Sequence, residues 1–423
     1  MKPMGAIPPD LAGAAPLLIA GRTASAWIDQ AGDTPLFVYD AGVVRRRIAR
    51  FRQAMPEGVD LHYAVKANPF PPLVAAMAPW VDGLDIASRG ELELVTAIAG
   101  KAASAISFAG PGKRDDELEL ALRAGVTINV ESAGEADRAL AIGGRLGVTP
   151  RLAVRVNPDI ELRGSGLRMG GRPSQFGVDA ERAAALVGRL IAAGADWRGF
   201  HIFAGSQALD AQAIIETQAA TVALAARLAE QAGAAPPLVN LGGGFGIPYF
   251  PADSVLDVEA IGAALAATLD GRPAILAGTR FAIELGRWLV GECGVYLTRV
   301  IDRKESRGET FLVVDGGLHH QLAASGNFGT VVKRNYPVAV ATAGKDAPVE
   351  TVSVVGCLCT PLDRLADRVT LPVAAPGDVI AIFMAGAYGL SASPSAFLGH
   401  ALPGEVLAGQ ADTPNAIFTS SVP

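Results

Sequence analysis

A lysine stands at the end of an apolar run early in the chain. Lys66 follows Tyr63-Ala64-Val65 and precedes Ala67-Asn68-Pro69. A lysine at the end of a buried strand is costly unless it is paired or chemically used. Two readings stay open for Lys66 alone: a side chain that reaches out to solvent, or an amine that bonds covalently to a carbonyl group.

Two later apolar runs also end in residues that suit a bound anion. One run is followed by Gly242-Gly243-Gly244-Phe245-Gly246, and a glycine-rich turn lets backbone N–H groups point at a phosphate. The next run ends in Glu284-Leu285-Gly286-Arg287, where the guanidinium suits a phosphate by bidentate contact. The glycine spacing matches neither a P-loop nor a dinucleotide-binding fingerprint, and glycines also serve tight turns.

Together these groups form a consistent set for pyridoxal 5'-phosphate. Lys66 would bond to the cofactor, while the glycines, Ser206 and Arg287 would hold its phosphate. A carboxylate facing the pyridine nitrogen would keep that nitrogen protonated, so that the ring can accept electrons from the substrate Cα. Asp85 is a further acid inside a strand pattern, and its alternative role is a structural salt bridge.

The elements that must position these residues alternate between short apolar runs and Ala/Leu-rich stretches with helical spacing. Eight runs between Leu61 and Gly286 predict strands, and alternation with helices predicts parallel pairing. This number of units fits a (β/α)8 barrel, in which functional groups lie at the C-terminal ends of the strands. An open doubly wound sheet is the alternative. The eight predicted strands are His62–Val65, Leu84–Ala87, Ala105–Ala109, Val126–Val130, Arg151–Val156, Trp197–Phe203, Leu238–Leu241 and Arg280–Glu284.

After Arg287 the alternation of apolar runs with helical stretches ends, and we expect an all-β second domain there. Strand-like runs alternate with Gly-, Pro-, Asn- and Asp-containing segments without a long amphipathic helix. We predict a lead-in over residues 1–40, a barrel over 41–288 and a β domain over 289–423. The strand-like Leu36–Tyr39 in the lead-in is expected to pair with the β domain. The later strands are predicted at Val295–Ile301, Thr310–Val314, Val352–Val355 and Val379–Phe383.

Composition narrows the classes of function. Of the 423 residues, 50% are apolar and 18% charged, which excludes global disorder and favours two domains. The net charge of −6 argues against nucleic-acid binding, and three cysteines do not make a disulfide framework. No uncharged apolar stretch reaches membrane-spanning length. The run Leu11–Ala20 imitates a secretory signal, but the preceding Pro8-Pro9-Asp10 and the following Arg22 favour a cytoplasmic enzyme.

Five motifs in order resemble the fold-type III pyridoxal-phosphate decarboxylases, which include diaminopimelate, ornithine and arginine decarboxylases. The resemblance covers roughly Leu36 to Glu405 and implies an alanine-racemase-type barrel with a C-terminal all-β domain. The motifs are Tyr63-Ala64-Val65-Lys66-Ala67-Asn68, Gly242-Gly243-Gly244-Phe245-Gly246, Glu284-Leu285-Gly286-Arg287, Cys359-Thr360-Pro361-Leu362-Asp363 and Gly386-Ala387-Tyr388-Gly389.

The resemblance also implies roles. Lys66 matches the lysine that binds the cofactor, and Glu284 matches the partner of the pyridine nitrogen. Cys359 matches the cysteine that returns a proton to the substrate carbon after carbon dioxide leaves, reaching across a homodimer interface. The remaining cofactor contacts implied are Asp85, Glu91, His201, Phe203, Ser206, Gly243, Gly244, Gly246, Gly286, Arg287 and Tyr388. Substrate contacts are expected at Arg287, Asp315, Thr360 and Asp363.

Three departures from the family pattern bear on substrate and cofactor. The family usually has His-x-His after the sixth strand, but here the second position is Phe203, so either His201 or Phe203 stacks on the cofactor. The residue after the catalytic cysteine is usually acidic and helps to grip a basic substrate, whereas here it is Thr360. His319 and His320 are either substrate contacts or loop histidines.

Thr360 therefore predicts a substrate with a neutral or masked distal end. The chain resembles a subgroup that contains the butirosin decarboxylase, which acts on glutamate tethered to an acyl carrier protein, and exosortase-associated decarboxylases of exopolysaccharide clusters. A carrier would need a basic landing surface, for which Arg303, Lys304 and Arg307 or the pair Lys333 and Arg334 are candidates.

Four other functions remain as alternatives. They are decarboxylation of free diaminopimelate or another basic amino acid, a racemase with Tyr388 as acid/base, a non-catalytic homologue and a metal-dependent barrel hydrolase. Intact Lys66, Glu284 and Cys359 disfavour the non-catalytic homologue. No metal site is expected, because the five histidines form no ligand motif and Cys357-Leu358-Cys359 lacks a second pair nearby in the sequence.

Overall fold

The computed structural model describes residues 2–159, 167–168, 173–326, 334–409 and 417–418. The chain divides into two compact units. One comprises Arg47–Ile247 and Val255–Trp288, and the other comprises Met1–Arg46, Pro248–Ser254 and Leu289–Pro423. The boundary between the two units at Trp288 and Leu289 falls where the alternation of apolar runs with helical stretches ends in the sequence. The segment Pro248–Ser254 also belongs to the second unit, and nothing in the sequence pattern predicts this.

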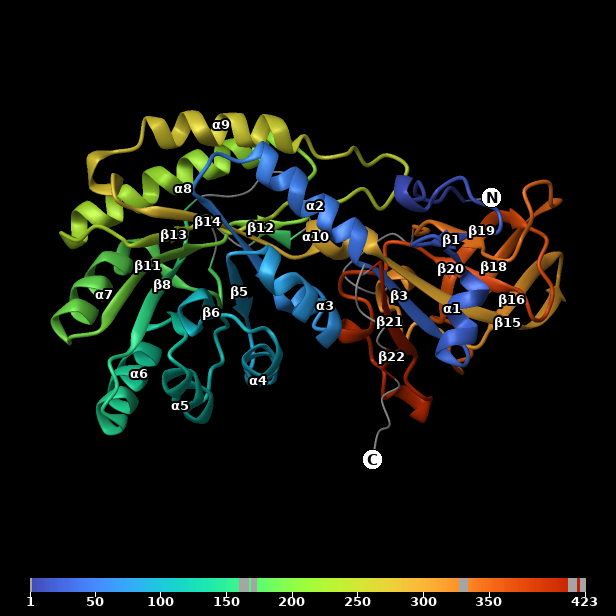
Figure 1. The fold of residues 1–423 in the computed structure, drawn as a ribbon, viewed down its shortest axis with the longest axis horizontal. Coiled ribbons are helices and arrows are strands. Elements are labelled where there is room, and N and C mark those ends of the chain that lie inside the picture. The colour runs from blue at the N-terminus through green and yellow to red at the C-terminus, as the bar shows by residue number, and fades with distance from the viewer. Residues whose placement is uncertain (1, 160–166, 169–172, 327–333, 410–416, 419–423) are drawn as a thin grey trace. The chain divides into compact units, whose positions relative to one another are not determined.

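The first unit contains a closed parallel barrel, drawn with its surrounding helices in Figure 1. Pairing of β7 with β8 closes the sheet, so the barrel prediction is confirmed and the open-sheet alternative is wrong. Within the described residues eight strands form the ring. In ring order they are β4 (Val59–Ala64), β5 (Gly83–Ile86), β6 (Ile106–Phe108), β7 (Thr127–Val130), β8 (Arg151–Asn157), β11 (Asp196–Ile202), β13 (Leu238–Asn240) and β14 (Arg280–Leu285).

Helices follow the barrel strands and carry recognisable start and stop signals. Ser88 begins α4, since its side chain accepts the N–H of Glu91, and Asp210 begins α8 in the same way. Helix α8 ends at Gly233, which adopts the left-handed conformation typical of a helix C-terminus. The helices of this unit are α2 (Ala41–Ala54, whose first residues lie in the other unit), α3 (Pro71–Met77), α4 (Arg89–Ile98), α5 (Asp115–Ala124), α6 (Ala133–Leu146), α7 (Ala180–Ala192), α8 (Ala211–Ala232), α9 (Val258–Asp270) and α10 (Arg287–Val290, continuing into the other unit).

Glycine permits close approach between two barrel strands. Gly199 on β11 has φ of +106°, and a Cβ there would lie 1.9 Å from the Leu238 carbonyl oxygen. A larger residue would push β11 away from β13 and alter the register that carries His201 beside Asn240. The glycine therefore fixes the strand that presents His201.

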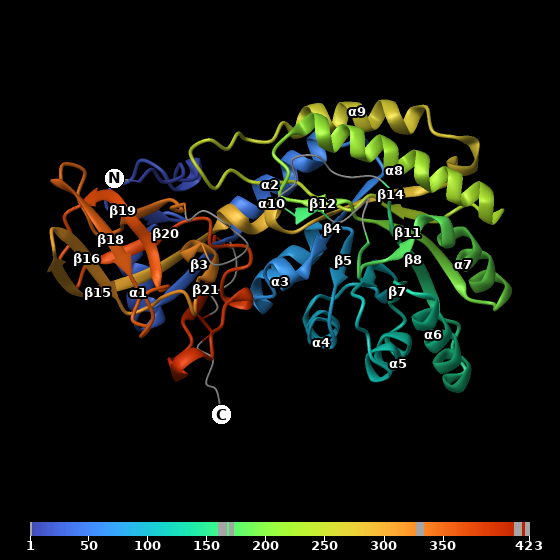
Figure 2. The same cartoon turned by 180° about the vertical axis from the view of Figure 1, so that it is seen from behind.

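The second unit is built on a mixed sheet, seen from behind in Figure 2. Its strand β3 comes from the start of the chain and lies between β15 and β21. All five residues of β3 are buried. The strands are β3 (Leu36–Asp40), β15 (Gly294–Ser306), β16 (Glu309–Val314), β17 (Val338–Val340), β18 (Val349–Val355), β19 (Arg364–Pro372), β20 (Val379–Ile382), β21 (Gly404–Ala408) and β22 (Ile417–Phe418).

The remaining elements are short. Helix α1 (Ala24–Ala31) belongs to the β unit, and Thr23 accepts the N–H of Ala26 at its start. Two-residue strands complete the assignment: β1 (Leu18–Ile19), β2 (Arg22–Thr23), β9 (Leu167–Arg168), β10 (Val178–Asp179) and β12 (Gly205–Ser206). In the described part of the chain, the helices are too short or too polar to cross a bilayer.

Candidate active site

Lys66 lies in a single 3-10 turn, Val65–Ala67, directly after β4. The turn is held by Tyr63, whose hydroxyl donates to the Asn68 carbonyl oxygen at 2.8 Å. The Lys66 side chain is 48% exposed, and its Nζ lies 3.6 Å from Glu284 Oε1. The same Nζ is 5.7 Å from the centre of the Phe203 ring. The amine is therefore both accessible and next to a carboxylate.

Glu284 is buried near the end of β14 and contacts one group on β11 and one in the turn after β4. Its Oε2 lies 2.9 Å from His201 Nε2, and its Oε1 faces Lys66. Burial alone would raise the pKa of Glu284, but the Lys66 ammonium and the hydrogen bond with His201 hold the pKa well below its usual range. Glu284 is thus a carboxylate at neutral pH, able to stabilise a positively charged ring nitrogen.

Asp85 belongs to a second polar group, which spans three adjacent strands. His62 Nδ1 on β4 lies 3.3 Å from Asp85 Oδ1 on β5, and Ser107 on β6 donates its hydroxyl to the same oxygen. Burial disfavours a charged His62, yet the Asp85 carboxylate raises the pKa of His62 above its ordinary value. Position 83 must be glycine here, because a Cβ would lie 2.6 Å from the His62 ring. His62 and Ser107 are not among the predicted site residues, although each is a polar residue inside an apolar strand, which is a signal visible in the sequence.

The glycine-rich turn after β13 is built around close backbone approaches. Gly242 and Gly244 have φ of +70° and +89°. A Cβ on Gly243 would lie 1.8 Å from the Glu284 carbonyl oxygen. Gly244 accepts the Ala208 N–H at 2.8 Å, and Gly246 donates its N–H to the Ala208 carbonyl oxygen at 2.9 Å. The turn is therefore packed against β14 on one side and the segment after Ser206 on the other.

Gly286 and Arg287 place the last motif of the barrel beside the lysine turn. A Cβ on Gly286 would lie 2.8 Å from the Ala67 side chain, so glycine at this position lets the Lys66 turn pack. Arg287 begins α10 and is half-buried. Ser206 in β12 is also half-buried. Gln207 follows with φ of +58° and donates from Nε2 to the Ile247 carbonyl oxygen at 2.7 Å. This bond ties the Ser206 segment to the end of the glycine-rich turn.

Two further acids stand near these groups. Glu91 Oε2 accepts the Ala87 N–H at 2.7 Å, and burial raises the pKa of Glu91 above its ordinary value. Glu131, which sequence reasoning missed, is buried and lies 2.8 Å from Arg155. Burial raises its pKa, but the charges of Arg155 and Lys113 and the hydrogen bonds from Arg155 and the Gly110 N–H together outweigh burial, so the pKa of Glu131 lies below its usual range. The charge of Arg155 also contributes to the low pKa of Glu284. Glu131 and Arg155 could have been found in the sequence as charged residues in or directly after apolar strands.

The other predicted site residues belong to the β unit. Cys359 is exposed, Thr360 is half-buried, and Tyr388 has φ of +52°, a conformation that side-chain-bearing residues rarely adopt. Asp363 is buried and accepts the N–H groups of Leu318 at 2.7 Å and Leu358 at 2.9 Å. It therefore holds two loops, and its contact with substrate stays a prediction.

Asp315 and the two adjacent histidines also lie in the β unit. Asp315 Oδ1 accepts from the Thr298 hydroxyl at 2.6 Å and from the Arg299 N–H at 2.9 Å. His319 and His320 are buried rather than exposed, which corrects the loop-surface reading. Burial lowers the pKa of His319 to about 4 and that of His320 to about 3, so both rings are neutral at pH 7.

Comparison with known proteins identifies the first unit. Residues 41–291 match the family model described as the pyridoxal-dependent decarboxylase, pyridoxal binding domain. The chain is 36% identical to an L-glutamyl-[BtrI acyl-carrier protein] decarboxylase from Niallia circulans, with 89% of each chain covered. It is 31% identical to a diaminopimelate decarboxylase from Aquifex aeolicus, with 85% of this chain and 83% of that protein covered.

A solved structure agrees over nearly the whole chain. Diaminopimelate decarboxylase from Helicobacter pylori, complexed with L-lysine, superposes with a TM-score of 0.81 at 26% identity, covering 93% of this chain and 95% of that one. The agreement extends past residue 291, where the family model ends, into the β unit.

The residues present fit pyridoxal phosphate. Buried His201 Nδ1 and Asp85 Oδ2 have no hydrogen-bond partner among the described residues, as expected at a site that receives a polar ring. An accessible Lys66 beside an ionised Glu284 suits a carbonyl compound with a basic ring nitrogen. Family match, fold and site chemistry agree, and the chain belongs to the pyridoxal-dependent decarboxylases, carboxy-lyases that act on amino acids.

Proposed function

We propose that this decarboxylase acts on an amino acid with a masked distal end, such as a glutamyl group linked to an acyl carrier protein. The relative from Niallia circulans is named for that activity and matches 89% of the chain. The observation that carries the proposal is Thr360, a half-buried neutral residue directly after the exposed Cys359. A threonine offers little attraction for a distal ammonium group, so a free basic amino acid would lack an ionic partner there.

The barrel residues hold the cofactor in this proposal. Lys66 binds it covalently, Glu284 faces its ring nitrogen, and Ser206, Arg287 and the Gly242–Gly246 turn take its phosphate. When bound, pyridoxal phosphate withdraws electrons from the substrate Cα and so weakens the bond to the carboxylate. Glu284 contributes by staying ionised, because its low pKa keeps a negative charge opposite the ring nitrogen at neutral pH.

Phe203 is the aromatic residue that we place against the cofactor ring. Its half-buried ring lies 5.7 Å from Lys66 Nζ, on the accessible side of the site. His201 is buried and hydrogen-bonded to Glu284. This division gives Phe203 the stacking role and gives His201 the role of orienting Glu284.

Cys359 is the proton donor in this proposal, and the site is shared between two copies of the chain. Cys359 is exposed on the β unit, so its thiol is available to a partner protomer. Arg287 and Tyr388 complete the phosphate contacts. Sedimentation of the purified protein tests for the homodimer. Mixing Lys66→Ala with Cys359→Ala tests for sharing, because a shared site regains activity in mixed dimers.

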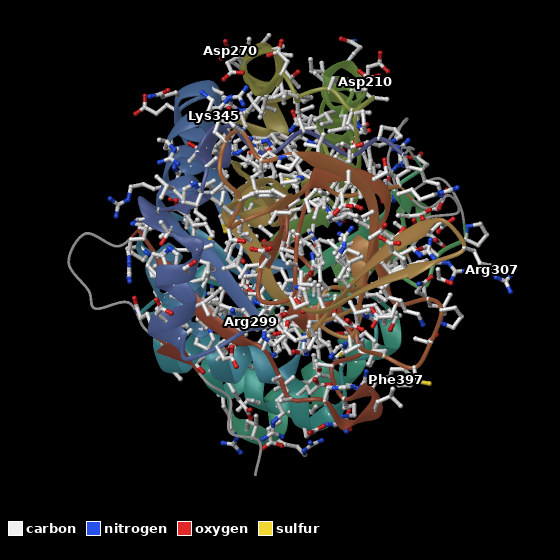
Figure 3. All side chains as sticks on the ribbon, turned by 90° about the vertical axis from the view of Figure 1, so that its right-hand side faces the viewer. Asp210, Asp270, Arg299, Arg307, Lys345 and Phe397 are labelled. Atoms are coloured by element: carbon white, nitrogen blue, oxygen red, sulfur yellow. The ribbon has the colours of Figure 1, made fainter. Side chains whose placement is uncertain are left out.

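A carrier protein needs a basic surface, and the turn between β15 and β16 offers part of one. Arg307 projects from this turn in Figure 3. Arg303 is bound bidentately by Glu350, which leaves Lys304 and Arg307 as the exposed basic groups of that cluster. Lys333 lies outside the described residues, and Arg334 stacks on Phe250 with 3.7 Å between guanidinium and ring. We propose the β15–β16 turn as the landing surface.

The location of the enzyme remains part of the proposal. Three free cysteines fit a reducing cytoplasm. The sequence resemblance to exosortase-associated decarboxylases favours a place in exopolysaccharide synthesis.

Carbon dioxide release by the cofactor-loaded enzyme tests the proposed substrate. The panel is free diaminopimelate, ornithine, lysine, arginine and glutamate, together with glutamate loaded on a carrier protein. We expect turnover of the tethered substrate alone. Faster turnover of free diaminopimelate would overturn the proposal and favour the activity named for the Aquifex and Helicobacter relatives. Chiral analysis of unreacted amino acid separates decarboxylation from racemisation in the same samples.

A further inference from the structure

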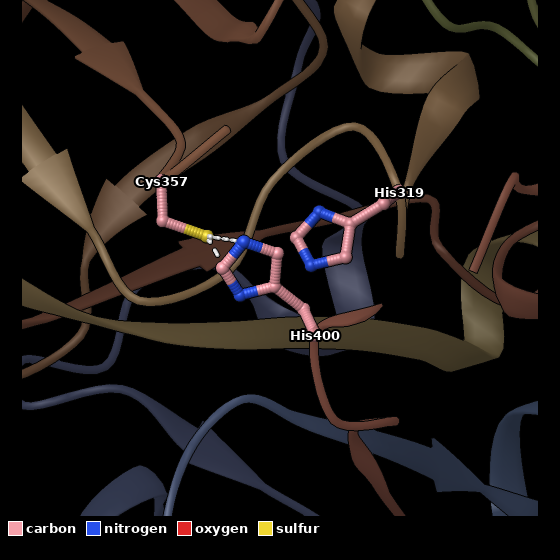
Figure 4. A group of neighbouring side chains, drawn as sticks. All are labelled: His319, Cys357 and His400. Carbon is pink, nitrogen blue, oxygen red and sulfur yellow. Dashed lines mark hydrogen bonds between the residues drawn. The ribbon is translucent and has the colours of Figure 1, made fainter. Parts of the chain in front are cut away.

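Three metal-binding side chains converge in the β unit from segments far apart in the sequence. They are His319 from the loop after β16, Cys357 after β18 and His400 before β21. Their ligand atoms all lie within 4.8 Å of one another. Figure 4 shows the His400 ring between the Cys357 thiol and the His319 ring. The Cys357 Sγ is 3.9 Å from His400 Nδ1 and 4.0 Å from His400 Nε2.

His319 lacks the partners that a buried imidazole normally has. Its side chain is fully buried, and neither Nδ1 nor Nε2 has a hydrogen-bond partner among the described residues. A neutral imidazole has one donor and one acceptor nitrogen, and leaving both without partners away from water is unfavourable. This unsatisfied ring lies 5.1 Å, centre to centre, from the ring of His400. No described residue supplies the missing partner, so the ring can bind an added species.

The loops that carry these side chains are held by other residues. Asp363 accepts the N–H of Leu318, next to His319, and the N–H of Leu358, next to Cys357. The Cys357 N–H also donates to the Gly316 carbonyl oxygen at 3.2 Å, which joins the two loops directly. A single buried carboxylate thus fixes the separation between His319 and Cys357.

The third segment is fixed by His320. Its Nε2 donates to the Ala401 carbonyl oxygen at 3.0 Å, and its Nδ1 accepts from the Tyr296 hydroxyl at 3.0 Å. The rings of His319 and His320 are 3.7 Å apart, centre to centre. Such supporting bonds orient metal ligands in known sites. His320 therefore anchors the chain next to His400 while packing on His319.

We propose that His319, Cys357 and His400 bind a zinc ion, with a water molecule in the fourth position. Two imidazoles and one thiolate are a ligand set that zinc takes in tetrahedral geometry. Bond lengths of about 2.0–2.1 Å to nitrogen and 2.3 Å to sulfur require ligand atoms roughly 3.3–3.7 Å apart. The present spacing needs only a small inward rotation of the side chains. Binding releases the Cys357 thiol proton to solvent as the Zn–S bond forms.

This site does not depend on the proposed substrate or on the barrel cluster. His400 is exposed, so the fourth position opens toward solvent on the side of that residue. An open position lets the ion take a water molecule or an anionic group. The site could not be predicted from the spacing of these residues in the sequence. His319, Cys357 and His400 lie far apart along the chain, and they are brought together by the loops that Asp363 and His320 hold.

Metal titration of the full-length, cofactor-loaded enzyme tests the proposal. The protein is treated with EDTA, freed of chelator and titrated with Co²⁺ alone, followed by Zn²⁺. We expect one Co²⁺ per chain with sulfur-to-cobalt charge-transfer absorption, and displacement of that Co²⁺ by one Zn²⁺. X-ray absorption of the zinc form should show sulfur near about 2.3 Å and nitrogen near about 2.0–2.1 Å.

Two accessible ligands provide variants that should not disturb the fold. Cys357→Ser should abolish the charge-transfer absorption, and His400→Ala should weaken Co²⁺ binding by about 100-fold or more. Cys359→Ser, a cysteine only two positions away, is the matched control and should retain both signals. The proposal is overturned if no stoichiometric Co²⁺ binds, or if Cys357→Ser binds Co²⁺ with unchanged absorption, which would mean an adventitious ion only.

Discussion

The barrel and the β unit each contain a buried histidine in a polar cluster, but the two clusters carry charge differently. In the barrel, His201 contacts Glu284, and Glu284 also faces Lys66. In the β unit, both nitrogens of His319 are unpaired among the described residues, and its ring lies near the Cys357 thiol and the rings of His320 and His400. The first cluster holds an ionised carboxylate, whereas in the second burial lowers the pKa of His319 to about 4, so that its imidazole is neutral at pH 7.

The difference shows what a buried ionisable group needs. Burial pushes both clusters toward their uncharged forms, and only the barrel provides opposite charges that reverse this. A charged cluster suits a cofactor whose ring nitrogen carries a positive charge. A buried imidazole with both nitrogens unpaired among the described residues suits an ion that brings its own charge.

Removing the barrel amine should have the largest effect on activity. Lys66→Ala removes the group that binds the cofactor covalently, so we expect kcat for carbon dioxide release to fall by about 10³-fold or more. Activity within tenfold of the unmodified enzyme would refute the role of Lys66.

Neutralising the barrel carboxylate should have the next largest effect. Glu284→Gln keeps a group of similar shape near His201 but removes the negative charge, and we expect kcat to fall by about 10²–10³-fold. Glu259→Gln is the matched control, because Glu259 is exposed and pairs with Arg50 on the outside of the barrel. Equal losses in the two variants would show that the effect is not specific to the site.

A change in the β unit should alter substrate choice more than rate. Thr360→Glu places a carboxylate directly after Cys359, and we expect kcat/KM for free ornithine or diaminopimelate to rise by about tenfold relative to the tethered substrate. Thr360→Gln adds similar volume without charge and serves as the control. A rise of the same size with Thr360→Gln would mean that size, not charge, sets the preference.

The smallest expected effect concerns stability and pH. The pKa of His62 is raised in the folded protein by Asp85, so the pair stabilises the fold fully below about pH 6.5 and loses this contribution as pH rises through the raised pKa. We expect the free energy of unfolding to fall more between pH 6 and pH 9 in the unmodified protein than in His62→Gln. Urea unfolding at the two pH values measures this change. An equal fall in the free energy of unfolding in both proteins would contradict the prediction.

Most of the barrel could be predicted from sequence because its strands are short, apolar and separated by helical periodicity. All eight predicted strands overlap observed ones, with ends that differ by a few residues. Lys66, the Gly242–Gly246 turn and Glu284 could be chosen as candidate site residues because each lies at the end of a predicted strand. The segment Pro248–Ser254 could not be assigned to the β unit, because its place depends on contacts with distant residues such as Tyr336.

The missed residues share one physical cause. His62 and Ser107 lie inside strands, and their partner Asp85 is on the strand between them, so only the ring order brings the three together. The His319, Cys357 and His400 cluster depends in the same way on loops held by Asp363. The spacing of residues along the chain indicates which side chains are close on one helix or strand. It does not indicate which side chains on different elements are close in the fold.

The position of β3 has a consequence for how the chain is made on the ribosome. Leu36–Asp40 is synthesised early, but its partners β15 and β21 come from the last third of the chain. The barrel strands lie between them in the sequence and can pair among themselves as they emerge. A nascent chain must therefore carry β3, which is mostly apolar, without either of these neighbours until β15 has been made, and its second neighbour β21 follows about a hundred residues later.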